Sequence, residues 1–246
     1  DFSQLPQCED GQHSDQCFTS DQIDIIREIY TGPEINGTLF YPGFPLGCEN
    51  EKGSWMTWIV GPDPGTMQLN FPNLHYAFGT ELCKYLIFND PDWDYSTYDF
   101  SHYNEDTRYA AAYLDATSTD YSAFEGRGGK LIFYHGWNDP ALSAYTTIEH
   151  FEAVRKKNPG VDEFMRLYLL PGVLHCGGGP GPDQADWLEL VRKWVENDQP
   201  PGKVVLSKVR DGQVQMTRPV FPYPSTAKYV GKGDPLDGNN FVEKKP

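Results

Sequence analysis

The segment Gly128–Val195 constrains the fold most, because its pattern predicts strand, helix, strand and helix in that order. Residues 131–134 and 167–170 are apolar runs closed by Gly or Pro, which is typical of buried strands. Residues 142–157 and 183–199 carry apolar side chains at spacings of three and four, which is typical of amphipathic helices. This order predicts an α/β fold in which the two strands are parallel neighbours.

An Asp and a His follow these two strands. Asp139 lies in Trp137-Asn138-Asp139-Pro140 and His175 in Leu174-His175-Cys176-Gly177. Functional side chains in α/β sheets gather at the carboxyl ends of the strands, and Asp before His is the order of the last two triad members in α/β-hydrolases. In such a triad the imidazole takes the nucleophile's proton and the carboxylate holds its tautomer. On these two motifs alone a turn Asp and a loop His remain the alternative.

The flanking segments carry weaker patterns. Residues 19–22, Thr-Ser-Asp-Gln, match a capping box and predict a helix that Gly32-Pro33 ends. Residues 39–78 are rich in Pro, Gly and aromatic residues without a sustained period, so we expect irregular loops and short elements there. In the tail we expect one strand at 204–206 followed by coil that wraps the surface.

An ordered set of motifs along nearly the whole chain resembles the tannase and feruloyl esterase family. They are Cys17-Phe18-Thr19, Tyr30-Thr31-Gly32-Pro33, Phe88-Asn89-Asp90-Pro91-Asp92-Trp93-Asp94, Asp120-Tyr121-Ser122-Ala123-Phe124, Gly128-Gly129-Lys130-Leu131, His135-Gly136-Trp137-Asn138-Asp139-Pro140, His175-Cys176-Gly177-Gly178-Gly179-Pro180-Gly181, Trp194-Val195-Glu196 with Pro200-Pro201, and Arg218-Pro219-Val220-Phe221-Pro222-Tyr223-Pro224. The resemblance implies an α/β fold that is the C-terminal part of an α/β-hydrolase fold with part of an inserted irregular lid domain. Residues 1–127 would then be the lid portion, and residues 128–246 the C-terminal part of the catalytic domain with its tail.

The resemblance also implies roles for individual residues. Asp139 corresponds to the triad acid and His175 to the general base. Cys176 corresponds to a cysteine that is disulfide-bonded to the residue before the nucleophilic Ser. Ala141 and Leu142, just after the acid, correspond to residues that line the substrate pocket.

No nucleophile can be assigned in this sequence. None of the five cysteines is followed by Ser, and no Gly-x-Ser-x-Gly motif occurs. The chain therefore looks like the C-terminal part of a larger enzyme. Fungal tannases of the family that it resembles are made as one precursor and cut into two disulfide-linked chains, so the resemblance implies the C-terminal chain of a proteolytically processed fungal tannase. The N-terminal chain of the same precursor would supply the Ser and the oxyanion hole, and would be linked to this chain through Cys176. The start at Asp1 without a signal peptide agrees with that expectation.

The cysteines indicate an oxidising compartment, because none stand at the close Cys-x-x-Cys spacing of a zinc site. The spacing of Cys8 and Cys17 is one that the family uses for a local lid disulfide, so we expect that pair. Cys48 and Cys83 are then the two cysteines left in the lid region, and we pair them. With the glycosylation sequon at Asn36, the cysteines predict a secreted glycoprotein.

Charge narrows the range of partners. The net charge of −15 disfavours nucleic acid and anionic membrane surfaces. No apolar run approaches the roughly 20 residues that a membrane span needs.

Asp90, Asp92 and Asp94 form an acidic cluster of the kind that can bind Ca²⁺. The family's calcium site, however, belongs to a lid loop that should precede Asp1. We therefore expect no metal or cofactor in this chain and allow a structural calcium ion in the partner chain's part of the lid.

Three functions compete at this point. The first is a tannase, a secreted serine esterase that hydrolyses galloyl esters of tannins through an acyl-enzyme. The second is a feruloyl esterase that acts on hydroxycinnamate esters of plant cell walls. The third belongs to another class: a non-catalytic, aromatic-rich binding module in which the Asp and the His are structural.

Overall fold

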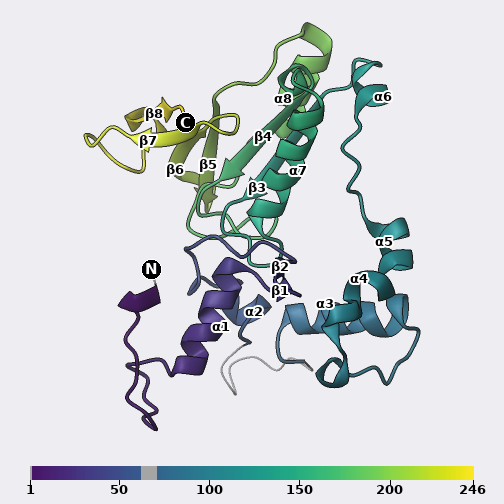
Figure 1. Ribbon diagram of the computed structural model, residues 1–246. Coiled ribbons are helices and arrows are strands. Elements are labelled where there is room, and N and C mark those ends of the chain that lie inside the picture. Colours follow the sequence, from purple (N-terminus) through teal and green to yellow (C-terminus); the bar gives the residue numbers. More distant parts are fainter. Residues whose placement is uncertain (1, 62–70) are drawn as a thin grey trace.

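The computed structural model describes residues 2–61 and 71–246. Figure 1 shows two parts of different architecture. The lower part is mainly helical and comes from the first half of the chain, while the upper part holds paired strands and two long helices. The chain passes once from the lower to the upper part, along the segment between α5 (Arg108–Leu114) and α6 (Ser122–Glu125).

The lower part is built from short elements. Its longest helix, α1 (Ser20–Thr31), begins with the expected capping box, in which Thr19 and Gln22 exchange side chain to backbone hydrogen bonds. Gly32 is its C-cap, as predicted. The remaining elements are η1 (Phe2–Gln4), β1 (Glu34–Ile35), β2 (Thr38–Leu39), α2 (Trp55–Trp58), α3 (Leu74–Leu82), the π-helical η2 (Cys83–Ile87), η3 (Tyr95–Thr97), η4 (Phe100–His102) and α4 (Tyr103–Asp106).

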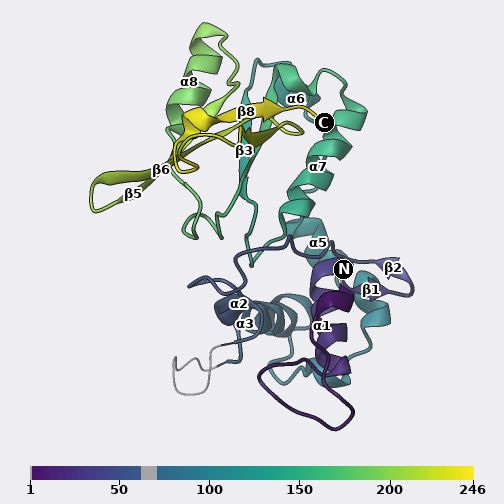
Figure 2. The same ribbon diagram turned by 90° about the vertical axis from the view of Figure 1, so that its left-hand side faces the viewer.

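The upper part contains the predicted βαβα unit. Strands β3 (Leu131–Gly136) and β4 (Met165–Leu170) are parallel and in register from Leu131↔Met165 to Gly136↔Leu170. Helix α7 (Ala144–Lys157) connects them through η5 (Val161–Glu163), and α8 (Trp187–Asn197) follows β4. The two helices cover opposite faces of the strand pair, as the turned view shows (Figure 2). The predicted parallel pairing is confirmed.

Alternation along β4 divides the core between the two faces. Met165 and Leu167 pack with Phe151 and Val154 of α7. On the other face, Tyr168 and Leu170 pack with apolar residues of the next strands, and Trp187 of α8 lies against them. Since successive strand residues point to opposite faces, an apolar run without polar interruptions is what a strand buried on both sides requires.

The tail differs from the expectation of one strand followed by coil. Strands β5 (Val204–Arg210) and β6 (Gln213–Val220) form an antiparallel hairpin. Strands β7 (Thr226–Tyr229) and β8 (Phe241–Lys244) form a second antiparallel pair, with η6 (Gly238–Asn240) before β8. Many of their side chains are polar or exposed, so the sequence pattern was weak, and backbone pairing between distant segments decides the structure.

The boundary between the two parts at 127/128 stays a prediction. Tyr121 and Phe124, which precede it, pack against the apolar core around Phe151 in the upper part. No helix in residues 2–61 or 71–246 is long and apolar enough to cross a membrane.

Candidate active site

Two loops cross at the carboxyl ends of β3 and β4. Gly136 ends β3, and a Cβ atom there would lie 2.4 Å from the carbonyl oxygen of Leu174, so the crossing requires glycine. Backbone hydrogen bonds join the loops, from Trp137 N to Leu170 O at 2.9 Å and from Asn138 N to Val173 O at 3.1 Å. The crossing brings together the residues that follow the two strands.

The predicted acid and base meet at this crossing. His175 Nδ1 lies 2.9 Å from Asp139 Oδ2. The side chain of Asp139 is 5% exposed, and that of His175 is 36% exposed. Since a carboxylate only accepts hydrogen bonds, Nδ1 carries the proton and the Nε2 of a neutral His175 is the nitrogen that can accept one.

The carboxylate of Asp139 receives several donors. Its Oδ1 accepts from the backbone amides of Ala141 at 2.8 Å and Leu142 at 3.0 Å. Burial alone raises the pKa of Asp139, but the hydrogen bonds from His135, His175 and the two amides outweigh burial and lower the pKa below its ordinary value. The group is therefore held as an anion.

Ala141 and Leu142 were predicted to line the substrate pocket. Their amides hold Asp139, and the exposed side chain of Leu142 lines a cavity of about 300 Å³. Asp139, His175 and Cys176 also line this cavity. A role of Ala141 and Leu142 in substrate binding stays a prediction.

A second histidine contacts the acid and was missed by sequence reasoning. His135, near the end of β3, places its Nε2 3.4 Å from Asp139 Oδ2, and its side chain is 14% exposed. The residue was visible in the sequence only as part of the motif before Asp139. The spacing of four residues between His135 and Asp139 did not predict a contact, because β3 ends between them and the periodicity of a strand or helix does not apply.

The loop after His175 has an unusual backbone. Cys176, Gly178 and Gly179 have φ values of 61°, 76° and 77°, a region that favours glycine. The loop is held by Asp183, whose Oδ2 accepts from Gly178 N at 2.8 Å, and by Lys208, whose Nζ donates to Gly179 O at 2.8 Å. Cys176 carries an exposed free thiol next to His175.

Aromatic side chains from the lower part lie over the pair. The ring of Trp58 meets that of His175 edge-on, with centroids 5.2 Å apart, and stacks on Phe78. His75, at the start of α3, donates from Nε2 to Ala141 O at 3.1 Å and also contacts Trp58. We call Trp58, His75 and Phe78 the aromatic cover. The sequence shows that residues 39–78 are rich in aromatic residues but does not indicate which of them reach the site.

A segment of the lower part, residues 41–49, is bonded to the residues around the acid, and we call it the strap. Asn138 donates from Nδ2 to the carbonyl oxygens of Leu46 and Gly47, both at 2.9 Å. Ser143, the N-cap of α7, donates from Oγ to Gly43 O at 2.6 Å. The strap therefore fixes the lower part against the loop that carries Asp139.

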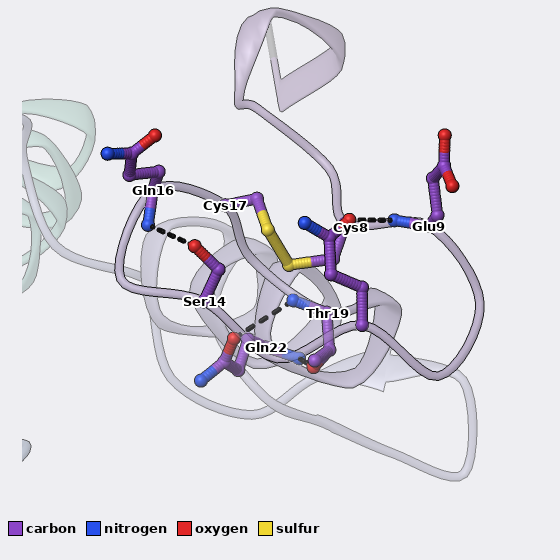
Figure 3. Close-up of a disulfide and its surroundings, with 8 residues drawn as sticks. Cys8, Glu9, Ser14, Gln16, Cys17, Thr19 and Gln22 are labelled. Carbon is purple, nitrogen blue, oxygen red and sulfur yellow. Dashed lines mark hydrogen bonds between the residues drawn. A yellow bond between two sulfur atoms is a disulfide. The ribbon is translucent and has the colours of Figure 1, made fainter.

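The cysteines form one of the two expected lid disulfides. Cys8 and Cys17 are joined, as Figure 3 shows, with Cα atoms 5.0 Å apart. The expected Cys48–Cys83 pair is wrong in this structure, where both thiols are free. Cys83 lies on η2 and lines a cavity of the lower part with Phe40 and other aromatic residues, whereas Cys48 lies in the strap. Their different surroundings explain why no bond forms.

The other predicted sites lie away from the pair. Asn36 is exposed in the β1–β2 turn, and its glycosylation stays a prediction. Asp90 and Asp94 accept hydrogen bonds from backbone amides two residues on, which makes them turn residues. Within residues 2–61 and 71–246, no group of three or more His, Cys, Asp and Glu side chains is arranged to hold a metal ion.

The sequence is similar to those of known esterases. The family model described as "Tannase and feruloyl esterase" matches residues 1–243. Mono(2-hydroxyethyl) terephthalate hydrolase of Piscinibacter sakaiensis is 42% identical over 134 residues, which cover 53% of this chain and 22% of that protein. Feruloyl esterase C of Talaromyces stipitatus is 28% identical over 264 residues, covering 97% of this chain and 46% of that protein.

The solved structures show the same fold. The crystal structure of feruloyl esterase B from Aspergillus oryzae superposes with a TM-score of 0.79 at 24% identity, covering 99% of this chain and 50% of that one. This likeness confirms the expected fold class, part of an α/β-hydrolase fold with part of a lid. The chain spans half the length of that protein, and less than half of the two relatives above.

Proposed function

The chain belongs to the tannase and feruloyl esterase family, and we propose that it provides the acid and the base of a serine esterase. The observation that carries the proposal is the 2.9 Å contact between His175 Nδ1 and Asp139 Oδ2, with Asp139 held as an anion. In a triad of this kind the remaining imidazole nitrogen takes the proton of the nucleophile. Esterase names among the relatives support the same reaction class.

The mechanism is acyl transfer through a serine ester. A Ser from another part of the complete enzyme attacks the ester carbonyl while His175 Nε2 takes its proton. His175 then protonates the leaving alcohol, and water hydrolyses the acyl-enzyme by the same proton transfers in reverse. Asp139 holds the tautomer and stabilises the imidazolium. The amides of the oxyanion hole come from the part of the enzyme that carries the Ser.

We propose that a disulfide bond of Cys176 positions the nucleophilic Ser. Its exposed thiol and His175 line the same cavity of about 300 Å³. A disulfide from Cys176 to the residue before the Ser would bring the hydroxyl to this cavity, beside His175 Nε2. If the Ser is on a separate N-terminal chain, reduction separates two chains on a denaturing gel and inactivates the enzyme. A peptide map with Cys176 as a free thiol in the active enzyme would overturn this linkage.

The acyl group is that of an aromatic acid. Trp58 of the aromatic cover meets the ring of His175 edge-on and stacks on Phe78, and aromatic rings pack favourably on aromatic acyl groups. Terephthalate and ferulate, named in the relatives, are both aromatic acids. The relatives' names favour hydroxycinnamate esters, and galloyl esters, the tannase substrates, are the second candidate because of the family to which the chain belongs.

Hydrolysis of methyl ferulate, methyl gallate and methyl acetate by the complete enzyme tests the proposal. We expect the two aromatic esters to be cleaved with a higher kcat/KM than the acetate, and the larger of the two values identifies the acyl class. Activity toward none of the three would support the binding module instead.

Secretion is part of the same proposal. The Cys8–Cys17 disulfide needs an oxidising compartment, and Asn36 is exposed in a turn where a glycan can be attached. Release of a glycan from Asn36 by an endoglycosidase, seen as a mass change of its peptide, tests this part. A structural calcium ion in the rest of the lid remains a proposal for the complete enzyme.

A further inference from the structure

We propose that His135 is a positioning residue for the triad acid and that Thr147 sets its tautomer, so that two histidines hold Oδ2 of Asp139. The inference rests on the proposed esterase function. It starts from the shared oxygen: Asp139 Oδ2 lies 2.9 Å from His175 Nδ1 and 3.4 Å from His135 Nε2. One carboxylate oxygen therefore faces a ring nitrogen on either side.

The neighbours of His135 determine which of its nitrogens carries the proton. Nε2 lies 3.1 Å from the carbonyl oxygen of Leu142, which can only accept. Nε2 is therefore the N–H donor, directed at Leu142 O and Asp139 Oδ2. In the neutral ring Nδ1 must then accept, and its partner at 2.7 Å is the hydroxyl of Thr147, which can donate.

Thr147 is placed by helix α7. Ser143 caps this helix, and the first turn of the helix brings the Thr147 hydroxyl to Nδ1 of His135, which comes from β3. The chain of contacts runs from Thr147 through His135 and Asp139 to His175. Residues of α7, of β3 and of the loop that carries Asp139 are thus connected by consecutive polar contacts that end at His175.

The donors divide between the two carboxylate oxygens of Asp139. The amides of Ala141 and Leu142 hold Oδ1, so Oδ2 is left for the histidines. Other titratable groups face the acid from the lower part: His75 of α3, bonded to Ala141 O, and Tyr41 of the strap, whose hydroxyl accepts from Ser143 N. Neither donates to Oδ2, so His135 is the second donor to that oxygen in the described structure.

Removing the donor should lower the turnover number. Oδ2 loses one of the two histidine nitrogens that face it, so the carboxylate is less firmly directed at His175 and kcat falls. Substrate binding does not involve this contact, so KM should change little.

Variants of the complete enzyme separate positioning from packing. His135→Phe keeps an aromatic ring and removes the donor, and we expect kcat to fall about 10–100-fold, the usual cost of removing the group behind an active side chain. His135→Gln places an amide N–H near the position of Nε2 and should restore most of kcat. Thr147→Val removes the donor to Nδ1 and should lower kcat less, and Thr147→Ser should restore it. Thr217→Val, which removes a partly buried threonine hydroxyl that accepts from Gly238 N in the tail, is the control and should leave kcat unchanged.

A readout independent of activity keeps this inference distinct from the esterase proposal. Nitrogen-15 chemical shifts of labelled histidine report the tautomer, with the His135 signals assigned through His135→Gln. We expect His135 protonated on Nε2 in the wild type and a mixture of tautomers in Thr147→Val. A proton on Nδ1 in the wild type overturns the inference even if the enzyme is active. Wild-type kcat in His135→Phe also overturns it, whereas an inactive wild type with the expected tautomer contradicts only the esterase function.

Discussion

Asn138 donates a hydrogen bond from Nδ2 to the carbonyl oxygen of Gly47, 91 positions earlier in the chain, at 2.9 Å. Its Oδ1 accepts from Gly172 N at 3.1 Å, in the turn after β4. The side chain is only 8% exposed, and all of its named partners are backbone groups. This residue therefore ties the strap to both loops of the candidate site, next to the acid itself.

Replacing Asn138 by Asp should loosen the attachment of the strap to the candidate site. The carboxylate cannot donate, so it would face the carbonyl oxygens of Leu46 and Gly47 without a hydrogen atom between them. We expect a loss of about 1–3 kcal/mol in the free energy of unfolding, measured by urea denaturation. We also expect a higher KM for aromatic esters, because Phe44 of the strap stacks on His75 of the aromatic cover.

Asn158→Asp is the matched control for this variant. Asn158 donates to Glu125 and caps the far end of α7, so its replacement removes a comparable partly buried contact away from the site. It should cost stability and leave KM unchanged. Equal changes of KM in both variants would contradict the role assigned to Asn138.

Loss of the base or the acid should abolish turnover without unfolding the protein. We expect His175→Ala and Asp139→Asn to lower kcat about 10⁴-fold, measured with the best aromatic ester. His150→Ala, which removes another partly buried histidine of the same part of the fold, should keep most of the activity. More than a tenth of the wild-type kcat in His175→Ala would contradict the assignment of the base.

Asp139 should make stability depend on pH. Its folded-state pKa lies below the ordinary value of 3.8, so its ionised form stabilises the fold. This contribution is fully present above the unfolded-state pKa and is lost as pH falls through the lower folded-state value. Asp139→Asn should therefore be less stable than the wild type near neutral pH, and the difference should shrink below about pH 4. Urea denaturation across this range tests it, and a constant difference would contradict it.

The contacts of Lys208 should matter for the position of His175. Lys208→Met removes the hydrogen bond to Gly179 O and the 3.5 Å ion pair with Asp183, so the loop that follows His175 gains freedom. We expect a several-fold lower kcat with little change of KM, measured by steady-state kinetics. Lys193→Met, which removes an exposed ion pair on α8, is the control and should leave both constants unchanged. If Lys208→Met changed KM alone, its action on the base would be disproved.

The sequence by itself determined the elements whose signals are local. The apolar runs of β3 and β4 and the stripe of α8 specify buried strands and a helix, because periodicity expresses which faces are covered. The capping box at Thr19 likewise acts within one helical turn. The order of Asp139 and His175 after parallel strands was enough to predict that the two side chains would lie at the same end of the sheet.

Only the tertiary structure decided what surrounds that pair. His135, Trp58 and Asn138 reach the site through contacts that span many residues or join different elements, and none of these leaves a periodic trace in the sequence. The free thiols of Cys48 and Cys83 also depend on the tertiary structure. Two cysteines form a disulfide only when the fold brings their Cα atoms close together, and the number of cysteines in a sequence does not determine this. The burial of Asp139, the strand pairing in the tail and the direction of each hydrogen bond at the site arise only when distant segments pack together. These features therefore could not be predicted from the sequence.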